Sequence, residues 1–215
     1  MRALVHVVDD NAAFRGSISA LLESVGIEAI SYDCAEDFLG SSISARPGCF
    51  LFDLRLPDMG GLELQSACVD RGYSQPIIFL TGFGEVDVSV QAMRQGATQF
   101  LTKPVGNERL LSHIRQAVDS DRKQRASRNR QSTVRARIDL LTAREREVLS
   151  YVLDGCANKE IGRFMGISHK TVELHRSNMM HKMHADSLAM LVRMCVEVGF
   201  LGTHTGAPVQ WPARA

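Results

Sequence analysis

The amino-acid sequence predicts an α/β domain with a doubly wound, five-stranded parallel sheet, followed by a linker and a small all-α domain. Strand-like and helix-like segments alternate over the first 119 residues, a polar basic segment follows, and the remainder is helical in pattern. The chain has 215 residues, 45% hydrophobic and 23% charged, which is ordinary for one or two globular domains. We therefore expect a first domain at 1–119, a basic linker at 120–138, a second domain at 139–201 and a disordered tail at 202–215, with docking of Trp211 onto the protein as the alternative for the tail.

The first domain contains five strand–helix units. The strand-like segments are short apolar runs at residues 4–8, 27–32, 49–52, 76–80 and 98–101. The helix-like segments, which carry apolar residues three and four positions apart, are residues 11–25, 35–39, 61–69, 86–95 and 108–118. Asn11 is placed to cap the first helix. Because strands and helices alternate, we expect a parallel sheet with helices on both faces.

Polar side chains follow four of these strands where each strand ends. Asp9 and Asp10 follow the first strand, Asp53 the third, Thr81 the fourth and Lys103 the fifth. In doubly wound sheets, groups that act on a ligand lie beyond the carboxyl ends of the strands. If the strand order is 2-1-3-4-5, the three carboxylates converge and repel one another unless a cation lies among them. Mg²⁺, which prefers oxygen ligands and retains several waters, fits such a site.

The two remaining residues suggest phosphoryl chemistry. Lys103 brings a positive charge and Thr81 a hydroxyl donor, and both groups suit the oxygens of a phosphoryl group. Asp53 would then be a carboxylate nucleophile that forms an acyl phosphate. Each residue alone also fits an ordinary role, as a loop hydroxyl, a surface lysine or a helix cap. Their common position at the strand ends favours the phosphoryl site.

The second domain is helical, and capping residues mark its helix ends. Thr142 and Glu145 form a capping box for the first helix. Asn158 can cap a second helix, Ser168 a third that runs to about residue 183, and a fourth spans about residues 187–198. Two short helices joined by a three-residue turn that contains glycine are the helix-turn-helix pattern.

The distribution of charge agrees with a nucleic-acid partner. Residues 1–119 carry 9 Lys/Arg and 15 Asp/Glu, whereas residues 120–215 carry 16 and 9. A basic second half suits double-stranded DNA, although a solvated basic surface gives the same counts. The linker carries seven Lys/Arg and almost nothing apolar, so we expect it to bury no core. Its start should continue the preceding helix. Its basic residues could also contact DNA phosphates, but a solvated linker is the favoured interpretation.

The third helix of the second domain has a candidate surface for reading DNA. Val172, Met179 and Met183 share one face and should pack inward. On the outer face, Leu174 suits a thymine methyl group and Glu173 can accept from cytosine. Ser177 lies on the same outer face, and the expected phosphate contacts, which position the helix without reading sequence, are Lys159, Lys170, Thr171, Arg176 and Lys182.

Several motifs resemble those of a known family. VVDDN, LFDLRLPDMGG, FLTGFG and FLTKPV resemble the receiver domain of bacterial two-component response regulators, which has a CheY-like fold. LTAREREVL, NKEIGRFMGIS and KTVELHRSNMMHKM resemble the LuxR-type helix-turn-helix. The combination resembles response regulators of the FixJ/NarL type.

This resemblance implies roles for individual residues. Asp53 would be the phosphoacceptor, and the metal ligands would be Asp9, Asp10, Asp53 and the backbone carbonyl of Arg55. Thr81 and Lys103 would bind the phosphoryl group, and the Lys103–Pro104 peptide bond would be cis. Phe100 stands at the place of the aromatic switch residue, although an ordinary strand aromatic is the alternative. The last helix would be a dimerisation element, and its apolar stripe is Leu188, Leu191, Val192 and Cys195.

We therefore expect a transcription regulator that takes a phosphoryl group from a sensor histidine kinase onto Asp53 with Mg²⁺, forms a homodimer and binds promoter DNA. It would lose the phosphoryl group slowly and would not be a turnover enzyme. One alternative is a DNA-binding regulator with a phosphorylation-independent receiver. Another is a phosphohydrolase of the haloacid dehalogenase type, against which the adjacent pair Asp9-Asp10 argues, since those enzymes use Asp-x-Asp.

The sequence also bears on where the protein works. No apolar run reaches the length of a membrane span, and the N-terminus lacks a signal-peptide pattern, so we expect a cytoplasmic protein that does not contact a membrane. The five cysteines are widely spaced and contain no C-x-x-C pair, which favours reduced, mostly buried thiols.

Overall fold

The computed structural model describes residues 2–82 and 86–200, with the side chains of residues 86–88 left out. The expected tail at 202–215 therefore lies outside the described residues. The chain divides into two compact units, Met1–Ala126 and Ser127–Ala215. Among the helices of the described ranges, none is long and apolar enough to cross a membrane.

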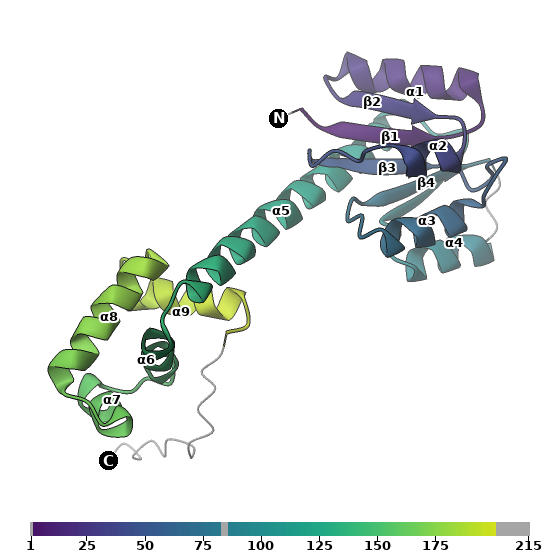
Figure 1. Cartoon of the computed structure of the whole chain (residues 1–215). Coiled ribbons are helices and arrows are strands. Elements are labelled where there is room, and N and C mark those ends of the chain that lie inside the picture. The colour runs from purple at the N-terminus through teal and green to yellow at the C-terminus, as the bar shows by residue number, and fades with distance from the viewer. Residues whose placement is uncertain (1, 83–85, 201–215) are drawn as a thin grey trace, which may run out of the picture. The chain divides into compact units, whose positions relative to one another are not determined.

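The first unit contains a parallel sheet of five strands (Figure 1). The strands are β1 (Leu4–Val8), β2 (Glu28–Tyr32), β3 (Gly48–Phe52), β4 (Ile77–Thr81) and β5 (Gln99–Thr102). Their order is β2-β1-β3-β4-β5, and all four neighbouring pairs run parallel. The predicted doubly wound fold is confirmed, and with it the strand order on which convergence of the carboxylates depends.

Helices cover both faces of this sheet, as Figure 1 shows. They are α1 (Ala12–Ser24), α2 (Ala35–Gly40), α3 (Gly61–Asp70), α4 (Val86–Arg94) and α5 (Asn107–Asp139). Ile18 of α1 and Ile114 of α5 pack in the core of one face, while Phe38 of α2 and Leu64 of α3 pack in the core of the other. Every residue of β1, β3 and β4 is buried, and this burial on both faces explains their continuous apolar runs.

The predicted helix cap of the first unit is present. The side chain of Asn11 accepts a hydrogen bond from the backbone N–H of Phe14 at 3.0 Å. This bond satisfies one of the N–H groups that have no partner within the first turn of α1. The cap sets the direction in which the chain leaves β1, directly after Asp9 and Asp10.

Helix α5 differs from the expected linker, because residues 120–138 are helical throughout. No glycine or proline interrupts this segment, and arginine, glutamine and alanine favour helix. Asp121 is buried in the first unit, whereas Val134 and Ile138 are buried in the core of the second. The expectation that this segment buries nothing is therefore wrong at these three residues.

The second unit continues with four helices (Figure 1). They are α6 (Ala143–Leu153), α7 (Asn158–Met165), α8 (His169–Met183) and α9 (Leu188–Glu197). Their shared core includes Leu149, Ile161, Val172 and Leu191, all fully buried. The helical architecture predicted for this part of the chain is confirmed.

The helix ends of the second unit follow the predictions with one exception. Thr142 accepts from the N–H of Glu145, whose carboxylate accepts from the N–H of Thr142, so the capping box is present. Ser168 caps α8 through the N–H of Thr171. Asn158, however, is the first residue of α7 and not its cap. The cap is Ala157, whose N–H is satisfied by the carboxylate of Glu160 at 2.7 Å.

A tight turn joins α7 to α8. Gly166 ends α7 with φ of 65°, a left-handed conformation that costs glycine little and other residues more. Ile167 and the cap Ser168 complete the connection. The predicted helix-turn-helix is therefore present, and it leaves one side of α8 exposed.

Candidate functional site

Three carboxylates meet at the carboxyl edge of the sheet. Asp9 and Asp10 follow β1, and Asp53 follows β3, its neighbour in the sheet, with Val8 paired to Phe52. One oxygen from each carboxylate lies within 4.8 Å of the others. Asp9 and Asp53 are buried, whereas Asp10 is exposed. The convergence expected from the strand order is thus present.

Lys103 lies between two of these carboxylates. Its Nζ donates to Asp9 Oδ2 at 2.5 Å and to Asp53 Oδ2 at 2.7 Å, and it lies 4.1 Å from the centre of the Phe14 ring. Burial lowers the pKa of Lys103, but the bonds to Asp53 and Asp9 outweigh this effect and raise the pKa above its usual value. The ammonium group therefore remains charged and neutralises the two buried carboxylates.

Thr81 and Lys103 come together because β4 and β5 are neighbours. Thr81 is the last residue of β4 and is fully buried, and its carbonyl oxygen accepts from the N–H of Lys103 at 2.7 Å. The peptide bond between Lys103 and Pro104 is cis, as the resemblance implied. The structure therefore places Thr81 and Lys103 at the same edge of the sheet as the acidic residues.

Phe100 lies on β5 opposite Phe79 of β4, with ring centres 6.2 Å apart. It is half-buried and packs at the margin of the core that contains α2, α3 and α4. This position suits a side chain that changes its packing, and it equally suits an ordinary strand aromatic.

The loop after β3 approaches the site closely. The N–H of Arg55 donates to Asp53 Oδ1 at 3.2 Å. At Gly61, the first residue of α3, an added Cβ would lie 2.4 Å from the carbonyl oxygen of Asp53 and 2.8 Å from Leu54 Cα. Only glycine permits this approach, which brings the start of α3 against the strand end that carries Asp53.

Sequence reasoning missed residues that hold Asp9 in place and one that caps a neighbouring helix. Arg15 donates to the carbonyl oxygen of Asp9 at 2.6 Å, and the N–H of Asn11 donates to Asp9 Oδ1 at 2.9 Å. Asp58 accepts from the N–H groups of Ala35 and Glu36 and so caps α2 from a different loop. Arg15 could have been suspected from its place one turn into α1, but no local signal identifies Asp58.

The donor set of this pocket fits a divalent cation. Asp9, Asp10 and Asp53 offer carboxylate oxygens, the ligands that Mg²⁺ prefers in proteins. Two of the three are buried, so their charges require a counter-charge. The chemistry of the pocket therefore agrees with the cation expected from the sequence.

The second candidate surface is the outer side of α8. Val172, Met179 and Met183 are fully buried, which confirms the predicted inner face. The exposed residues of the predicted set are Lys159, Lys170, Glu173, Leu174 and Ser177. Leu174 is 60% exposed, so its side chain is accessible to a partner on the outer side of α8.

Several of the predicted DNA contacts make hydrogen bonds within the unit. At the start of α8, the hydroxyl oxygens of Thr171 and Ser168 lie 2.8 Å apart and form a hydrogen bond. Arg176 donates to Asn158 Oδ1 at 2.9 Å and so connects α8 to α7. Lys182 donates to Glu145 Oε2 at 2.7 Å and connects α8 to α6. Arg176 and Lys182 thus position the helix, a role that sequence spacing did not indicate.

The apolar residues of α9 fall on two faces. Leu191 and Cys195 are fully buried in the core of the unit, so the expectation that they contact a second molecule is wrong for this conformation. Leu188 and Val192 are 43% and 36% exposed, and Val196, which was not predicted, is 59% exposed. Residues four apart share one helix face, so Leu188, Val192 and Val196 form the exposed stripe.

Comparisons with known proteins agree with this division. A family model described as the response regulator receiver domain matches residues 5–115, and one described as bacterial regulatory proteins of the luxR family matches residues 139–195. Nodulation protein W of Bradyrhizobium diazoefficiens is 35% identical over 204 residues, covering 95% of this chain and 90% of the relative. The transcriptional regulatory protein FixJ of Azorhizobium caulinodans is 38% identical over 204 residues, covering 95% and 97%.

Two solved structures are similar over most of the chain. The response regulator StyR is 36% identical, with a TM-score of 0.84, and the match covers 92% of this chain and 100% of that one. Full-length FixJ from B. japonicum is 37% identical, with a TM-score of 0.54, and the match covers 92% and 98%.

Proposed function

The chain belongs to the response regulators that join a receiver domain to a luxR-family DNA-binding domain, and we propose that phosphorylation of Asp53 by a sensor histidine kinase controls its binding to promoter DNA. Members of this family regulate transcription and are not turnover enzymes. The observation that carries the proposal is the pair of bonds from Lys103 to Asp9 and Asp53, at the strand ends where Thr81 also lies.

In the proposed reaction, a carboxylate oxygen of Asp53 attacks the phosphorus atom of the donor. A bond forms between this oxygen and phosphorus while the bond from phosphorus to the donor breaks, and the donor leaves with the electron pair. Lys103, whose Nζ lies 2.7 Å from Asp53 Oδ2, would bind the new phosphoryl oxygens, and the Thr81 hydroxyl at the end of β4 would donate to one of them.

Mg²⁺ held by Asp9, Asp10, Asp53 and the backbone carbonyl of Arg55 would neutralise charge on the transferring group. Three carboxylates with nearby oxygens support this set of ligands. The Arg55 carbonyl is proposed from the family resemblance, and the position of Arg55 two residues after Asp53 allows it.

The phosphoryl group would act as a switch by adding about two negative charges at neutral pH. The Thr81 hydroxyl and Lys103 would move toward these charges. Thr81 of β4 is paired with Thr102 of β5, and Phe100, two residues before Thr102, would repack in response. We propose that this change favours a homodimer in which Leu188, Val192 and Val196 of α9 meet the same residues of a second copy.

The outer face of α8 would enter the major groove. Leu174 and Glu173 would contact bases, and Ser177 lies on the same exposed side. Lys159, Lys170 and Thr171 would contact phosphates, and Arg176 and Lys182 would add to these contacts while holding α8 in place. A dimer would then bind two half-sites about one helical turn apart.

The test is the intact mass of the purified chain after incubation with acetyl phosphate, with and without Mg²⁺. The expected result is one Mg²⁺-dependent phosphoryl adduct that is absent from Asp53→Asn and present in the control Asp37→Asn, which alters an exposed acid on α2. Binding to DNA should strengthen when the adduct forms. An adduct on Asp53→Asn would show that Asp53 is not the phosphoacceptor, and DNA binding that ignores the adduct would support a phosphorylation-independent regulator.

A further inference from the structure

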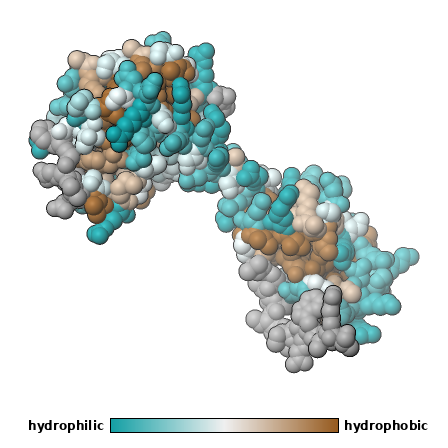
Figure 2. Space-filling view, turned by 180° about the vertical axis from the view of Figure 1, so that it is seen from behind, coloured by the Kyte–Doolittle hydropathy of each residue, from teal (hydrophilic) through white to brown (hydrophobic). Residues whose placement is uncertain are grey.

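A pocket in the second unit has no part in phosphorylation or in the proposed DNA contacts. It has a volume of about 350 Å³ and lies between the end of α5, the start of α6 and the residues after α9. Its lining includes Arg135, Ile138, Asp139, Arg146, Val198 and Phe200. Figure 2 shows a broad apolar area on the second unit, bordered by hydrophilic residues.

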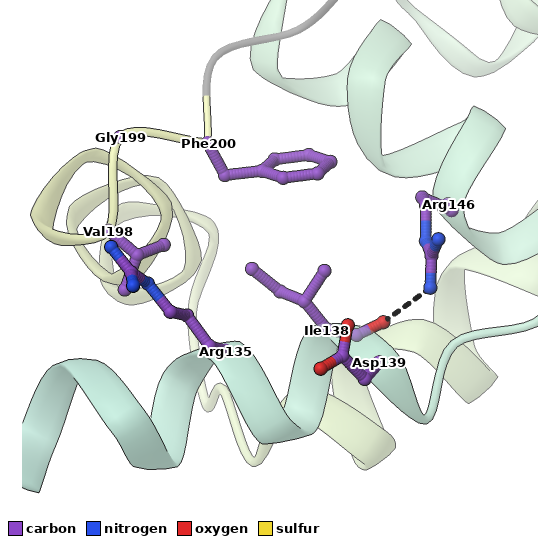
Figure 3. A pocket seen from close by; sticks show the side chains of 7 residues that line it. All are labelled: Arg135, Ile138, Asp139, Arg146, Val198, Gly199 and Phe200. Atoms are coloured by element: carbon purple, nitrogen blue, oxygen red, sulfur yellow. Dashed lines mark hydrogen bonds between the residues drawn. The ribbon is translucent and has the colours of Figure 1, made fainter.

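The pocket combines apolar walls with charged groups at its rim. In Figure 3, the side chain of Ile138 and the ring of Phe200 face one another across the opening, with Arg146 on one side and Arg135 on the other. Arg146 donates to the carbonyl oxygen of Ile138 at 3.2 Å, which holds its guanidinium group in place. Asp139 adds a carboxylate beside Ile138.

This set of groups suits an indole ring. An indole offers an apolar body for Ile138 and Phe200, and an aromatic face over which a guanidinium group binds favourably. Its single N–H can donate to a carboxylate such as that of Asp139. A purely aliphatic side chain could contact the apolar walls but offers neither an aromatic face for a guanidinium group nor an N–H for Asp139.

The chain itself supplies an indole next to the pocket. Phe200 is both a wall of the pocket and the last described residue, and the only tryptophan of the sequence, Trp211, follows eleven residues later. An extended chain of that length reaches about 36 Å, and Gly202, Gly206 and Pro208 are residue types that allow it to reverse direction. Tethering at Phe200 keeps the indole at an effective concentration of about a millimolar or more.

We propose that the C-terminal segment folds back on the second unit and places the side chain of Trp211 in this pocket. Docking would cover Ile138 and Phe200 and would connect the end of α5 with the residues that follow α9. A free aromatic compound could enter the same pocket, but the tethered indole competes at a concentration that a dilute ligand does not reach.

Trp211 makes the test direct, because all tryptophan emission of the full chain arises from this one residue. We expect the emission maximum of the full chain to lie at shorter wavelength than that of a synthetic peptide of residues 201–215, and acrylamide to quench it less. Emission and quenching equal to those of the free peptide would overturn the proposal.

Two variants test the pocket itself. Arg135→Glu changes an exposed rim residue and Phe200→Ala removes an apolar wall, so both should move emission and quenching toward the values of the peptide. Arg130→Glu, an exposed arginine on the same helix away from the pocket, should leave them unchanged. Shielded emission that neither pocket variant alters would place Trp211 elsewhere and overturn the proposal. None of these readouts depends on phosphate or DNA, so the result is independent of the proposed function.

Discussion

Lys103 supplies the positive charge that neutralises the buried carboxylates of the acidic pocket. Its ammonium group contacts one oxygen of Asp9 and one of Asp53, and both carboxylates are almost entirely shielded from water. A buried charge without a partner is strongly unfavourable, whereas a buried charge with two short bonds is tolerated. A divalent cation bound to the same carboxylates would take over part of this role.

Lys103→Met should therefore destabilise the first unit mainly when no divalent cation is present. We expect the free energy of unfolding to fall by about 2–3 kcal/mol in EDTA, because two buried carboxylates lose their counter-charge, and by clearly less in Mg²⁺. Thermal unfolding of the variant and the wild type in both buffers measures this difference. Lys123→Met, at an exposed position on α5, serves as control. Equal losses in EDTA and Mg²⁺ would contradict a cation site at these carboxylates.

Glu145 has a comparable position in the second unit. It caps α6 through the N–H of Thr142 and accepts from Lys182 of α8 at 2.7 Å. Burial raises the pKa of Glu145, but the bonds from Lys182 and Thr142 outweigh burial and lower the pKa below its usual value of 4.5. One carboxylate thus accepts a hydrogen bond at the start of α6 and also forms an ion pair that connects α8 to α6.

Glu145→Gln should lower the stability of the second unit by about 1–2 kcal/mol at neutral pH. The folded state of the wild type has the lower pKa, so the contribution of the carboxylate is complete above pH 4.5 and disappears as the pH falls through the folded pKa. Calorimetry should show a difference between variant and wild type that shrinks as the pH falls below 4.5. Glu160→Gln, an exposed capping residue on α7, should cost less. A difference that grows toward acid pH would refute the assigned shift.

At the scale of the element, α8 has one buried face and one exposed face. Its inner face packs Val172, Met179 and Met183 in the core, and its outer face leaves Leu174 exposed next to polar residues. The bonds of Arg176 to α7 and of Lys182 to α6 fix the rotation of the helix about its axis. Base reading requires this fixed rotation, because a bidentate or apolar contact in the groove tolerates little displacement.

Substitutions on the outer face of α8 should separate base reading from phosphate binding. Leu174→Ala should reduce the preference for the specific site by about 1–3 kcal/mol with little change in salt dependence. Lys170→Ala should weaken binding on every sequence and reduce the salt slope by about one. Fluorescence anisotropy with specific and random duplexes at several salt concentrations measures both, and Arg193→Ala on α9 is the control. If both variants weakened all duplexes equally, Leu174 would not contact bases.

At the scale of the whole molecule, α5 contributes to both units. Its first part packs on the sheet through Leu110 and Ile114, and its last part packs with the helical core through Val134 and Ile138. Asp121, fully buried, accepts from the N–H of Gly48 at 2.9 Å and from Arg125 at 2.6 Å. The segment between the two domains is therefore a structured part of each.

Dimerisation should depend on the exposed stripe of α9 once Asp53 is phosphorylated. Val192→Glu places a charge in the centre of the stripe, so we expect it to accept phosphate normally but to remain a monomer. Size-exclusion chromatography with light scattering, before and after acetyl phosphate, measures this. Leu140→Glu changes an exposed leucine of the same unit outside α9 and should dimerise like the wild type. A phosphorylated Val192→Glu dimer would exclude this stripe as the interface.

Local patterns in the sequence determined most of the architecture. The β1, β3 and β4 runs are apolar because both faces of each strand are covered, and such runs can be recognised one strand at a time. The side chains of Asn11, Thr142 and Ser168 accept hydrogen bonds from backbone N–H groups three residues later, so their capping roles can also be predicted from the local sequence. The carboxylates of the acidic pocket could be predicted because each follows a strand of a sheet with a common order.

Only the tertiary structure decided features that join distant parts of the chain. The sequence predicts that the segment around Asp121 buries no core, whereas the burial of Asp121 depends on its bond from Gly48, 73 positions away. The sequence predicts a phosphate contact for Lys182 and gives no sign of its bond to Glu145, which spans 37 positions. Leu188 and Leu191 are alike in sequence, yet one is exposed and the other is core, because the packing of neighbouring helices selects which face of α9 is covered. Periodicity identifies a helix, but the contacts of the folded chain decide what each side of it meets.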